Sequence, residues 1–266
     1  MREFYLYING VTYDLNGGRY LFTSPTGLGV AFSNTIADLG DGFSVTTKRG
    51  QKLGQVVGKL VFFKDGNRTP YDVYNQFVNN ATAYSDKIVL GYKPSNGLYM
   101  ANVELTYLTK TESNDNQFIE IPVAFDLKSL WYTKETKSLS GGTASFASVG
   151  ITTGFEVSIP THSKDIVIST RESGATSNVQ EVSLDFTSTT ESRPFVYSNV
   201  PNDSKIIAGL NVLGSVPADL TPYITSLEHP EKIYGRPTAP FSVSAFTSGG
   251  TALTGTVTCY KYWRTV

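Results

Sequence analysis

The sequence is poor in the residues from which disulfides and metal sites are built. It contains one cysteine, Cys259, and two histidines, His162 and His229, among 266 residues. One cysteine cannot form an internal disulfide, which excludes a disulfide-stabilised extracellular fold. Two histidines are too few for most zinc sites, and their polar or proline neighbours indicate solvated loops. We therefore expect no metal and no cofactor.

Charge and long apolar stretches are also scarce. The chain has 22 basic and 23 acidic residues, a formal net charge of −1, and only 17% charged residues. This balance gives no electrostatic reason for strong binding to nucleic acid or to an anionic membrane. No apolar run approaches the roughly 20 residues of a membrane helix, and the N-terminus lacks the apolar segment of a signal peptide. We expect no membrane insertion, and folding in a cytoplasm.

Aromatic and turn-forming residues are abundant. Aromatic residues make up 12% of the chain, which also has 24 glycines and 12 prolines. This composition favours a mainly β protein with many turns. One turn signal, Asn9-Gly10, directly follows the apolar segment Phe4 to Ile8 and predicts a hairpin.

One helix is expected, at about residues 70–84. Thr69 is a favourable N-cap, Pro70 suits the first helical position, and Asp72 suits the first turn. Apolar residues recur at three- and four-residue steps, which predicts a face packed on a sheet. These residues are Tyr71, Tyr74, Phe77, Val78, Ala81 and Tyr84.

Two alternating segments after this helix predict a long antiparallel hairpin. In the first, Val103, Leu105 and Tyr107 face one way, and apolar residues alternate likewise over residues 119–127. Residues 109–116 between them are polar throughout, which predicts an exposed tip.

The composition changes at about residue 134. Residues 134–148 are rich in Ser, Thr, Lys and Gly, which indicates a linker. Beyond them, apolar residues alternate in several segments without a strong helix signal, which predicts a β-sandwich. We therefore expect an N-terminal β-sandwich-like domain with one packed helix at residues 1–135, and a C-terminal β-sandwich at residues 136–266. Residues 187–240 have no assigned role.

No motif of a nucleophilic, dinucleotide-binding or metal-dependent enzyme is found. Cys259 alternates in phase with Val257 and Trp263, which predicts a buried and inert thiol. Carboxylates on or near the expected C-terminal strands leave a glycosidase-type pair as the remaining enzymatic route. They are Glu156, Asp165, Glu181 and Asp185. Solvent-facing charges are the simpler interpretation, so we expect no catalytic residue and no enzyme.

Several short segments of the first half stand in a characteristic order and spacing. They are Tyr7-Ile8-Asn9-Gly10-Val11, Gly27-Leu28-Gly29, Gly54 to Phe62, Tyr74 to Val78, Ile88 to Pro94, Gly97 to Val103, Leu108 to Glu112, Ile121 to Phe125, and Ser129-Leu130-Trp131-Tyr132. Over about residues 1–133 the chain therefore resembles the distal tail proteins of bacteriophages with long non-contractile tails, the siphovirus-type tail component family. The second half resembles the family only in kind, through the galectin-like β-sandwich that members often carry there.

The resemblance implies a structural virion protein. Members form hexameric rings, sometimes two stacked back to back, that join the tail tube to the baseplate or tail tip. The implied partners are further copies of the chain, the tail tube protein, the tail-associated tip protein, and receptor-binding or baseplate proteins. Genomic DNA would pass through the channel only in transit. The implied location is the virion tail tip, after assembly in the host cytoplasm.

Two alternatives stay open. The polar hairpin tip, with Lys110, Glu112, Asn114 and Asn116, is the candidate ring contact, and a tip without a partner is the other interpretation. A carbohydrate-binding module that recognises host cell-wall saccharide is the alternative function. Tyr260 and Tyr262 would then be exposed sugar-stacking aromatics, although cross-strand packing explains them equally well.

Overall fold

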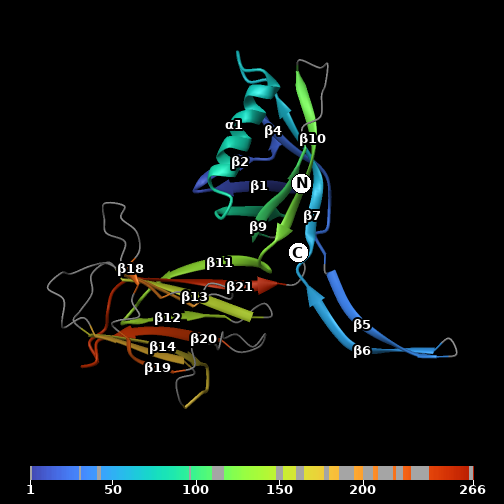
Figure 1. Cartoon of the computed structure of the whole chain (residues 1–266). Helices are drawn as coiled ribbons and strands as arrows, with labels where there is room; N and C mark the ends of the chain where they lie inside the picture. Colours follow the sequence, from blue (N-terminus) through green and yellow to red (C-terminus); the bar gives the residue numbers. More distant parts are fainter. Residues whose placement is uncertain are drawn as a thin grey trace. The chain divides into compact units, whose positions relative to one another are not determined.

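The computed structural model describes residues 2–29, 31–40, 43–95, 97–109, 117–147, 152–159, 165–176, 180–185, 195–199, 206–208, 218–219, 224–228, 240–263 and 266. The described residues form β-strands and a single α-helix, which confirms the expected mainly β fold (Figure 1). The chain divides into two compact units, one of residues 1–132 with 264–266 and one of residues 133–263. Each unit is described by itself.

The first unit is built from antiparallel strands and the helix. Its elements are β1 (Glu3–Ile8), β2 (Val11–Asp14), β3 (Asn16–Gly17), β4 (Tyr20–Thr26), β5 (Ala31–Gly40), β6 (Phe43–Lys52), β7 (Gln55–Phe63), α1 (Pro70–Ala83), β8 (Ile88–Lys93), β9 (Tyr99–Leu108) and β10 (Phe118–Leu127). The main sheet has the order β2-β1-β8-β9-β10-β7-β4-β3, whereas β5 and β6 form a separate pair. The strand β11 (Trp131–Ser138) begins in this unit and continues into the second.

The main sheet curves so that β1 and β4, which lie near its opposite ends, are both hydrogen-bonded to Leu15. The backbone nitrogen of Leu15 donates to the Phe4 oxygen at 3.0 Å, and the Leu15 oxygen accepts from the Phe22 nitrogen at 2.8 Å. Leu15 is almost fully buried, and the Phe4 and Phe22 rings meet edge to face at 5.1 Å. Burial of these apolar groups inside the curved sheet supplies the main stabilisation of the unit.

The helix α1 covers this core, as the sequence predicts. Its N-terminus has a complete capping box, in which the Thr69 hydroxyl accepts from the Asp72 nitrogen and the Asp72 carboxylate accepts from the Thr69 nitrogen. Phe77 is fully buried and meets the rings of Tyr13 and Phe62 at 5.3 and 5.4 Å.

The expected buried face of α1 is wrong in part. The buried residues are Pro70, Val73, Tyr74, Phe77 and Ala81. Tyr71 and Val78 are half-buried, because they lie roughly 100–120° around the helix axis from Phe77. Tyr84 is the C-cap and follows the last helical residue.

A β-bulge changes the facing of residues near the end of β9. Leu105 pairs with Phe125, but Tyr107 pairs with Ala124, so β9 has one residue more than β10 at this point. Tyr107 is consequently 49% exposed and does not continue the buried face of Val103, contrary to the expectation. The alternation of residues 119–127 is confirmed, except that Ala124 on the outward face is also buried.

The second unit contains two sheets around a shared core. One has the order β18-β17-β16-β13-β21-β11 and the other β12-β20-β14-β15-β19. Buried apolar residues of both sheets form one cluster, as in a β-sandwich. The elements are β12 (Thr143–Phe146), β13 (Thr152–Ile159), β14 (Asp165–Glu172), β15 (Gln180–Asp185), β16 (Phe195–Asn199), β17 (Ile206–Ala208), β18 (Ala218–Asp219), β19 (Ile224–Glu228), β20 (Phe241–Phe246) and β21 (Thr256–Trp263). The galectin-like character of this unit stays a prediction.

The expected linker at residues 134–148 is wrong, because most of this segment is folded as β11 and β12. Its few apolar residues, Leu139, Ala144 and Phe146, are buried in the core of the second unit. Gly142 between these strands has a positive φ of 77°, and a Cβ there would lie 2.8 Å from the Phe246 ring. The glycines therefore form a tight connection between the two strands, and Lys134, Thr136 and Lys137 occupy exposed positions of β11.

Candidate assembly surface

The pair β5–β6 is an isolated hairpin with no third strand in the described part of the chain. Figure 1 shows it as a two-stranded ribbon that continues beyond β7. Each strand has ten residues, which corresponds to about 33 Å of extended chain. An isolated two-stranded hairpin is at best marginally stable in water, so this ribbon has the properties of an element that completes its packing on another molecule.

Both faces of this hairpin carry an exposed apolar side chain. Ile36 pairs with Thr46, and the next pair, Ala37 with Val45, points to the opposite face. Ile36 is 63% exposed and Val45 is 45% exposed. Register shifts next to Ile36 and near Gly40 interrupt the ladder, and such bulges increase the local twist.

The sequence interpretation did not select this hairpin as a contact. Its signal was nevertheless present, because Asp41-Gly42 is a hairpin-turn dipeptide between two strand-forming segments. The expected contact residues Lys110, Glu112, Asn114 and Asn116 lie outside the described residues, as do His162 and His229.

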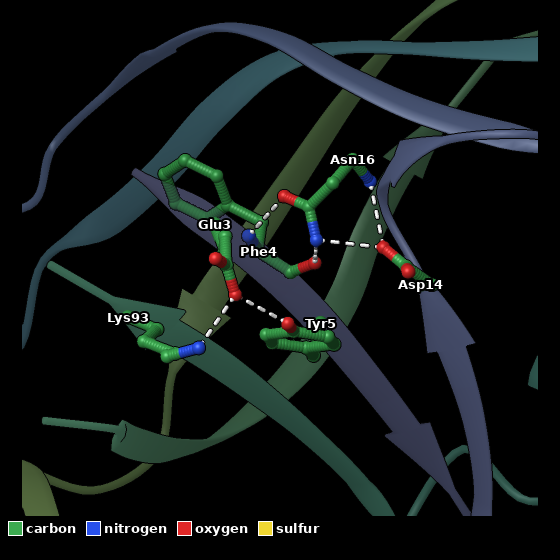
Figure 2. Close-up of polar contacts among 6 residues, drawn as sticks. All are labelled: Glu3, Phe4, Tyr5, Asp14, Asn16 and Lys93. Atoms are coloured by element: carbon green, nitrogen blue, oxygen red, sulfur yellow. Dashed lines mark hydrogen bonds and ion pairs between the residues drawn. The ribbon is translucent and has the colours of Figure 1, made fainter. Parts of the chain in front are cut away.

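A polar network fixes the N-terminal strand of the first unit (Figure 2). The Asn16 amide behaves like a peptide group toward Phe4: its Oδ1 accepts from the Phe4 nitrogen at 2.7 Å, and its Nδ2 donates to the Phe4 oxygen at 2.9 Å. The same Nδ2 donates to the Asp14 carboxylate at 2.6 Å. These partners define the orientation of the amide, because only its nitrogen can donate.

The outward residues of β1 form a second part of this network. The Glu3 carboxylate accepts from the Tyr5 hydroxyl and pairs with Lys93 at 2.9 Å. These contacts lower the pKa of Glu3, with the Tyr5 hydrogen bond as the largest cause. The same hydrogen bond raises the pKa of Tyr5 to about 12. The network holds the N-terminal strand in place.

The four candidate carboxylates do not form one cluster, although Asp165 and Asp185 lie directly opposite each other on neighbouring strands. Glu156 accepts from the Tyr260 hydroxyl at 3.0 Å on one sheet, whereas the other three residues lie on the opposite sheet. There Asp165 pairs in register with Asp185, and Glu181 lies four residues along β15 from Asp185, roughly 13 Å away. In the part of the chain that the structure describes, no group of three or more His, Cys, Asp or Glu residues could hold a metal ion.

The expected sugar-stacking aromatics are not a free pair. Tyr262 is 4% exposed, contrary to the expectation of an exposed ring. Tyr260 donates to Glu156, and the Lys134 ammonium lies 5.0 Å from its ring centroid. Lys261 and Trp263 are both in phase with Cys259 along β21: Lys261 is buried and pairs with Glu135 at 2.5 Å, and Trp263 is half-buried.

Cys259 is buried in the core of the second unit, as expected. Burial raises the pKa of its thiol to about 12, so the reactive thiolate is not formed near neutral pH. Among the described residues, no helix is long and apolar enough to cross a membrane.

Comparisons with known proteins give concordant results. Residues 4–128 match the family model described as distal tail protein, N-terminal domain. A chain of the phage p2 baseplate in its activated conformation with Sr has a similar fold, with a TM-score of 0.71, 15% identity and full coverage of both chains. The crystal structure of the Dit protein of phage SPP1, a paradigm of the hub adsorption apparatus in phages that infect Gram-positive hosts, has a TM-score of 0.55 and 10% identity, and covers 97% of this chain and 98% of the other. No curated protein sequence matches the chain.

Proposed function

Since residues 4–128 of this chain are the N-terminal domain of a distal tail protein, we propose that the chain forms a hexameric ring joining a phage tail tube to the baseplate or tail tip. The domain match confirms the expected family, and with it a structural tail component of the virion and not an enzyme. The ring itself, and its support of host-adhesion proteins, are the parts proposed here.

The isolated β5–β6 hairpin is the observation that carries the proposal. It exposes Ile36 and Val45 on opposite faces and pairs with no further strand in the described part of the chain. Proteins usually pair exposed strands of this kind with another strand, or cover them with another part of a protein. A neighbouring copy of the chain would cover the hairpin in the same way in every subunit. A contact between two different surfaces of the chain gives a closed ring when the rotation from one subunit to the next adds up to a full turn.

The proposed partners follow from this position in the tail. Besides its own copies, in one ring or two stacked rings, the chain contacts the tail tube protein on one side and the tip protein on the other. Receptor-binding or baseplate proteins attach to the ring, and genomic DNA passes through its channel in transit. Assembly takes place in the host cytoplasm.

The test is the solution mass by light scattering coupled to size exclusion, across a concentration series. The monomer has 29.0 kDa, and the expected species has six or twelve times that mass. A double variant, Ile36→Lys with Val45→Lys, is expected to remain a monomer, because it places charge on both faces of the hairpin. The matched control is Val11→Lys, since Val11 is 52% exposed and lies outside the hairpin.

Two results would count against the proposal. The first is a monomer at every concentration, both alone and with purified tail tube protein. The second is a ring that forms equally well with the double hairpin variant, because the hairpin would then have no part in assembly.

A further inference from the structure

Two Asn-Gly dipeptides of the first unit have closely similar sequence neighbours. Asn9-Gly10 follows Ile8, and Asn16-Gly17 follows Leu15. Asparagine is a thermolabile residue, and a following glycine has no Cβ that would shield its backbone nitrogen from the side-chain amide. At Gly10 and at Gly17 an added Cβ would meet nothing within 4 Å, so packing against the glycine does not distinguish the two sites. A third dipeptide, Asn96-Gly97, includes a residue outside the described part of the chain.

The first dipeptide forms the exposed turn between β1 and β2. Ile8 pairs with Val11, and Asn9 and Gly10 have positive φ angles of 47° and 81°, as in a two-residue hairpin turn. Both turn residues are exposed. Among the described residues, neither the Asn9 side chain nor the Gly10 nitrogen has a hydrogen-bond partner. The amide and the nitrogen that would react with it are therefore both open to water.

The side-chain amide of the second dipeptide is held by three hydrogen bonds (Figure 2). Its Oδ1 accepts from the Phe4 nitrogen at 2.7 Å, and its Nδ2 donates to the Phe4 oxygen at 2.9 Å and to Asp14 at 2.6 Å. Phe4 is buried, so water does not replace its two bonds freely. The Asn16 amide can turn toward the Gly17 nitrogen only after these bonds break.

We propose that Asn9 is a site of spontaneous deamidation, and that the hydrogen bonds of Asn16 protect the second dipeptide from the same reaction. The inference is independent of the proposed ring, because it concerns the folded first unit of a single copy. No enzyme or cofactor is required, since the chain supplies both reacting groups and water is the only co-reactant.

The reaction is an attack of the chain on its own side chain. The Gly10 nitrogen gives its proton to solvent and attacks the Asn9 Cγ. The new N–C bond closes a succinimide ring, while the side-chain nitrogen takes up a proton and leaves as ammonia. Water then adds to one of the two ring carbonyls and opens the ring, which gives an aspartyl or an isoaspartyl residue. In sum, an amide and water become a carboxylic acid and ammonia, and nothing is oxidised or reduced.

The two positions differ in what the reaction would change. At Asn9 it adds a negative charge to an exposed turn and leaves the bonds between Asn16 and Phe4 in place. At Asn16 it would remove the Nδ2 donor, on which the Phe4 oxygen and the Asp14 carboxylate depend. The protected dipeptide is thus the one whose conversion would weaken the first unit.

Peptide mapping by mass spectrometry tests this inference on the full-length chain. The folded protein is kept at a mildly alkaline pH and sampled over weeks, and a second sample is kept unfolded in guanidinium chloride under otherwise equal conditions. The mass change of each peptide and labelling by an isoaspartyl methyltransferase report the conversion of each asparagine. The unfolded sample gives the reactivity that each dipeptide has without the fold.

We expect folding to slow the reaction at Asn16 at least about tenfold more than at Asn9, because the hydrogen bonds of the Asn16 amide must break first. Asp14→Ala removes one of these bonds and should speed the conversion of Asn16 by about twofold or more, without a change at Asn9. The matched control is Thr12→Ala, which is exposed on the same strand and should change neither rate.

Three results would overturn the inference. The first is equal slowing of both asparagines by folding, because the amide hydrogen bonds of Asn16 would then add no protection. The second is a folded chain in which Asn9 is slowed more than Asn16. The third is a faster conversion of both residues in Asp14→Ala, which would indicate a general loosening of the fold. None of these results depends on the oligomeric state, so the ring proposal is tested separately.

Discussion

Replacement of Asn16 should weaken the first unit although its side chain is exposed. In Asn16→Ala, the nitrogen and the oxygen of Phe4 both lose their side-chain partner. Phe4 is buried, so water does not replace these bonds freely. At about 0.5–1.5 kcal/mol for each hydrogen bond, the expected loss in the free energy of unfolding is about 1–3 kcal/mol.

The fluorescence of Trp131 can report this loss for the first unit alone. Trp131 is buried beside Tyr92, whereas the second tryptophan, Trp263, lies in the other unit and can be replaced by Phe in every sample. Unfolding in urea then gives the midpoint and slope for each variant. The control is Asn79→Ala on the exposed side of α1, which should change stability by less than about 0.5 kcal/mol.

The variant Asn16→Asp separates the two hydrogen bonds. Its carboxylate can still accept from the Phe4 nitrogen, but it cannot donate to the Phe4 oxygen and it stands beside the Asp14 carboxylate. We expect a loss at neutral pH comparable to that of Asn16→Ala, and a partial recovery on acidification, when one carboxyl becomes protonated and can donate. A stability of Asn16→Ala within about 0.5 kcal/mol of the unchanged protein would refute this reasoning.

Three further substitutions test the core and the helix cap. Thr69→Ala removes the N-cap and should lower the free energy of unfolding in urea by about 1 kcal/mol. Because the hydrogen bonds from Thr69 lower the pKa of Asp72, the loss of stability in this variant should be largest near neutral pH and should decrease as the pH falls through the pKa of Asp72. Phe77→Ala should cost about 3–5 kcal/mol in the same assay, because the ring is fully buried among aromatic side chains. Gly58→Ala should lower the thermal midpoint, since its Cβ would lie 2.5 Å from the Phe22 ring, whereas Gly29→Ala, with open space around it, should not.

Local signals in the sequence predicted the local structure well. The helix start follows from Thr69, Pro70 and Asp72, which act within a single turn. The turn at Asn9-Gly10 is equally local, because both residues adopt the positive φ that this dipeptide favours. Strand alternation over residues 119–127 predicted the core face for the same reason.

Features set by tertiary pairing were not predictable in this way. The extra residue of β9 is visible only when Leu105 and Tyr107 are paired with β10. The segment from Lys134 to Phe146 has a linker-like composition, yet its backbone completes two sheets and its few apolar residues suffice for burial. The sequence also could not predict that the β5–β6 hairpin has no third strand among the described residues. That depends on how all the described strands pair with one another.

The buried position of Cys259 has a consequence for the durability of the particle. In the proposed assembly route the chain is made in the host cytoplasm, where thiols stay reduced, whereas a released particle is exposed to air before it meets a host. In the proposed ring of six or twelve copies, accessible thiols would lie at one tail tip, where they could form unwanted disulfides or oxidise, and either change would damage the particle. Because the single cysteine of each chain is buried and the pKa of its thiol is raised to about 12, the proposed assembly carries almost no thiolate for such reactions.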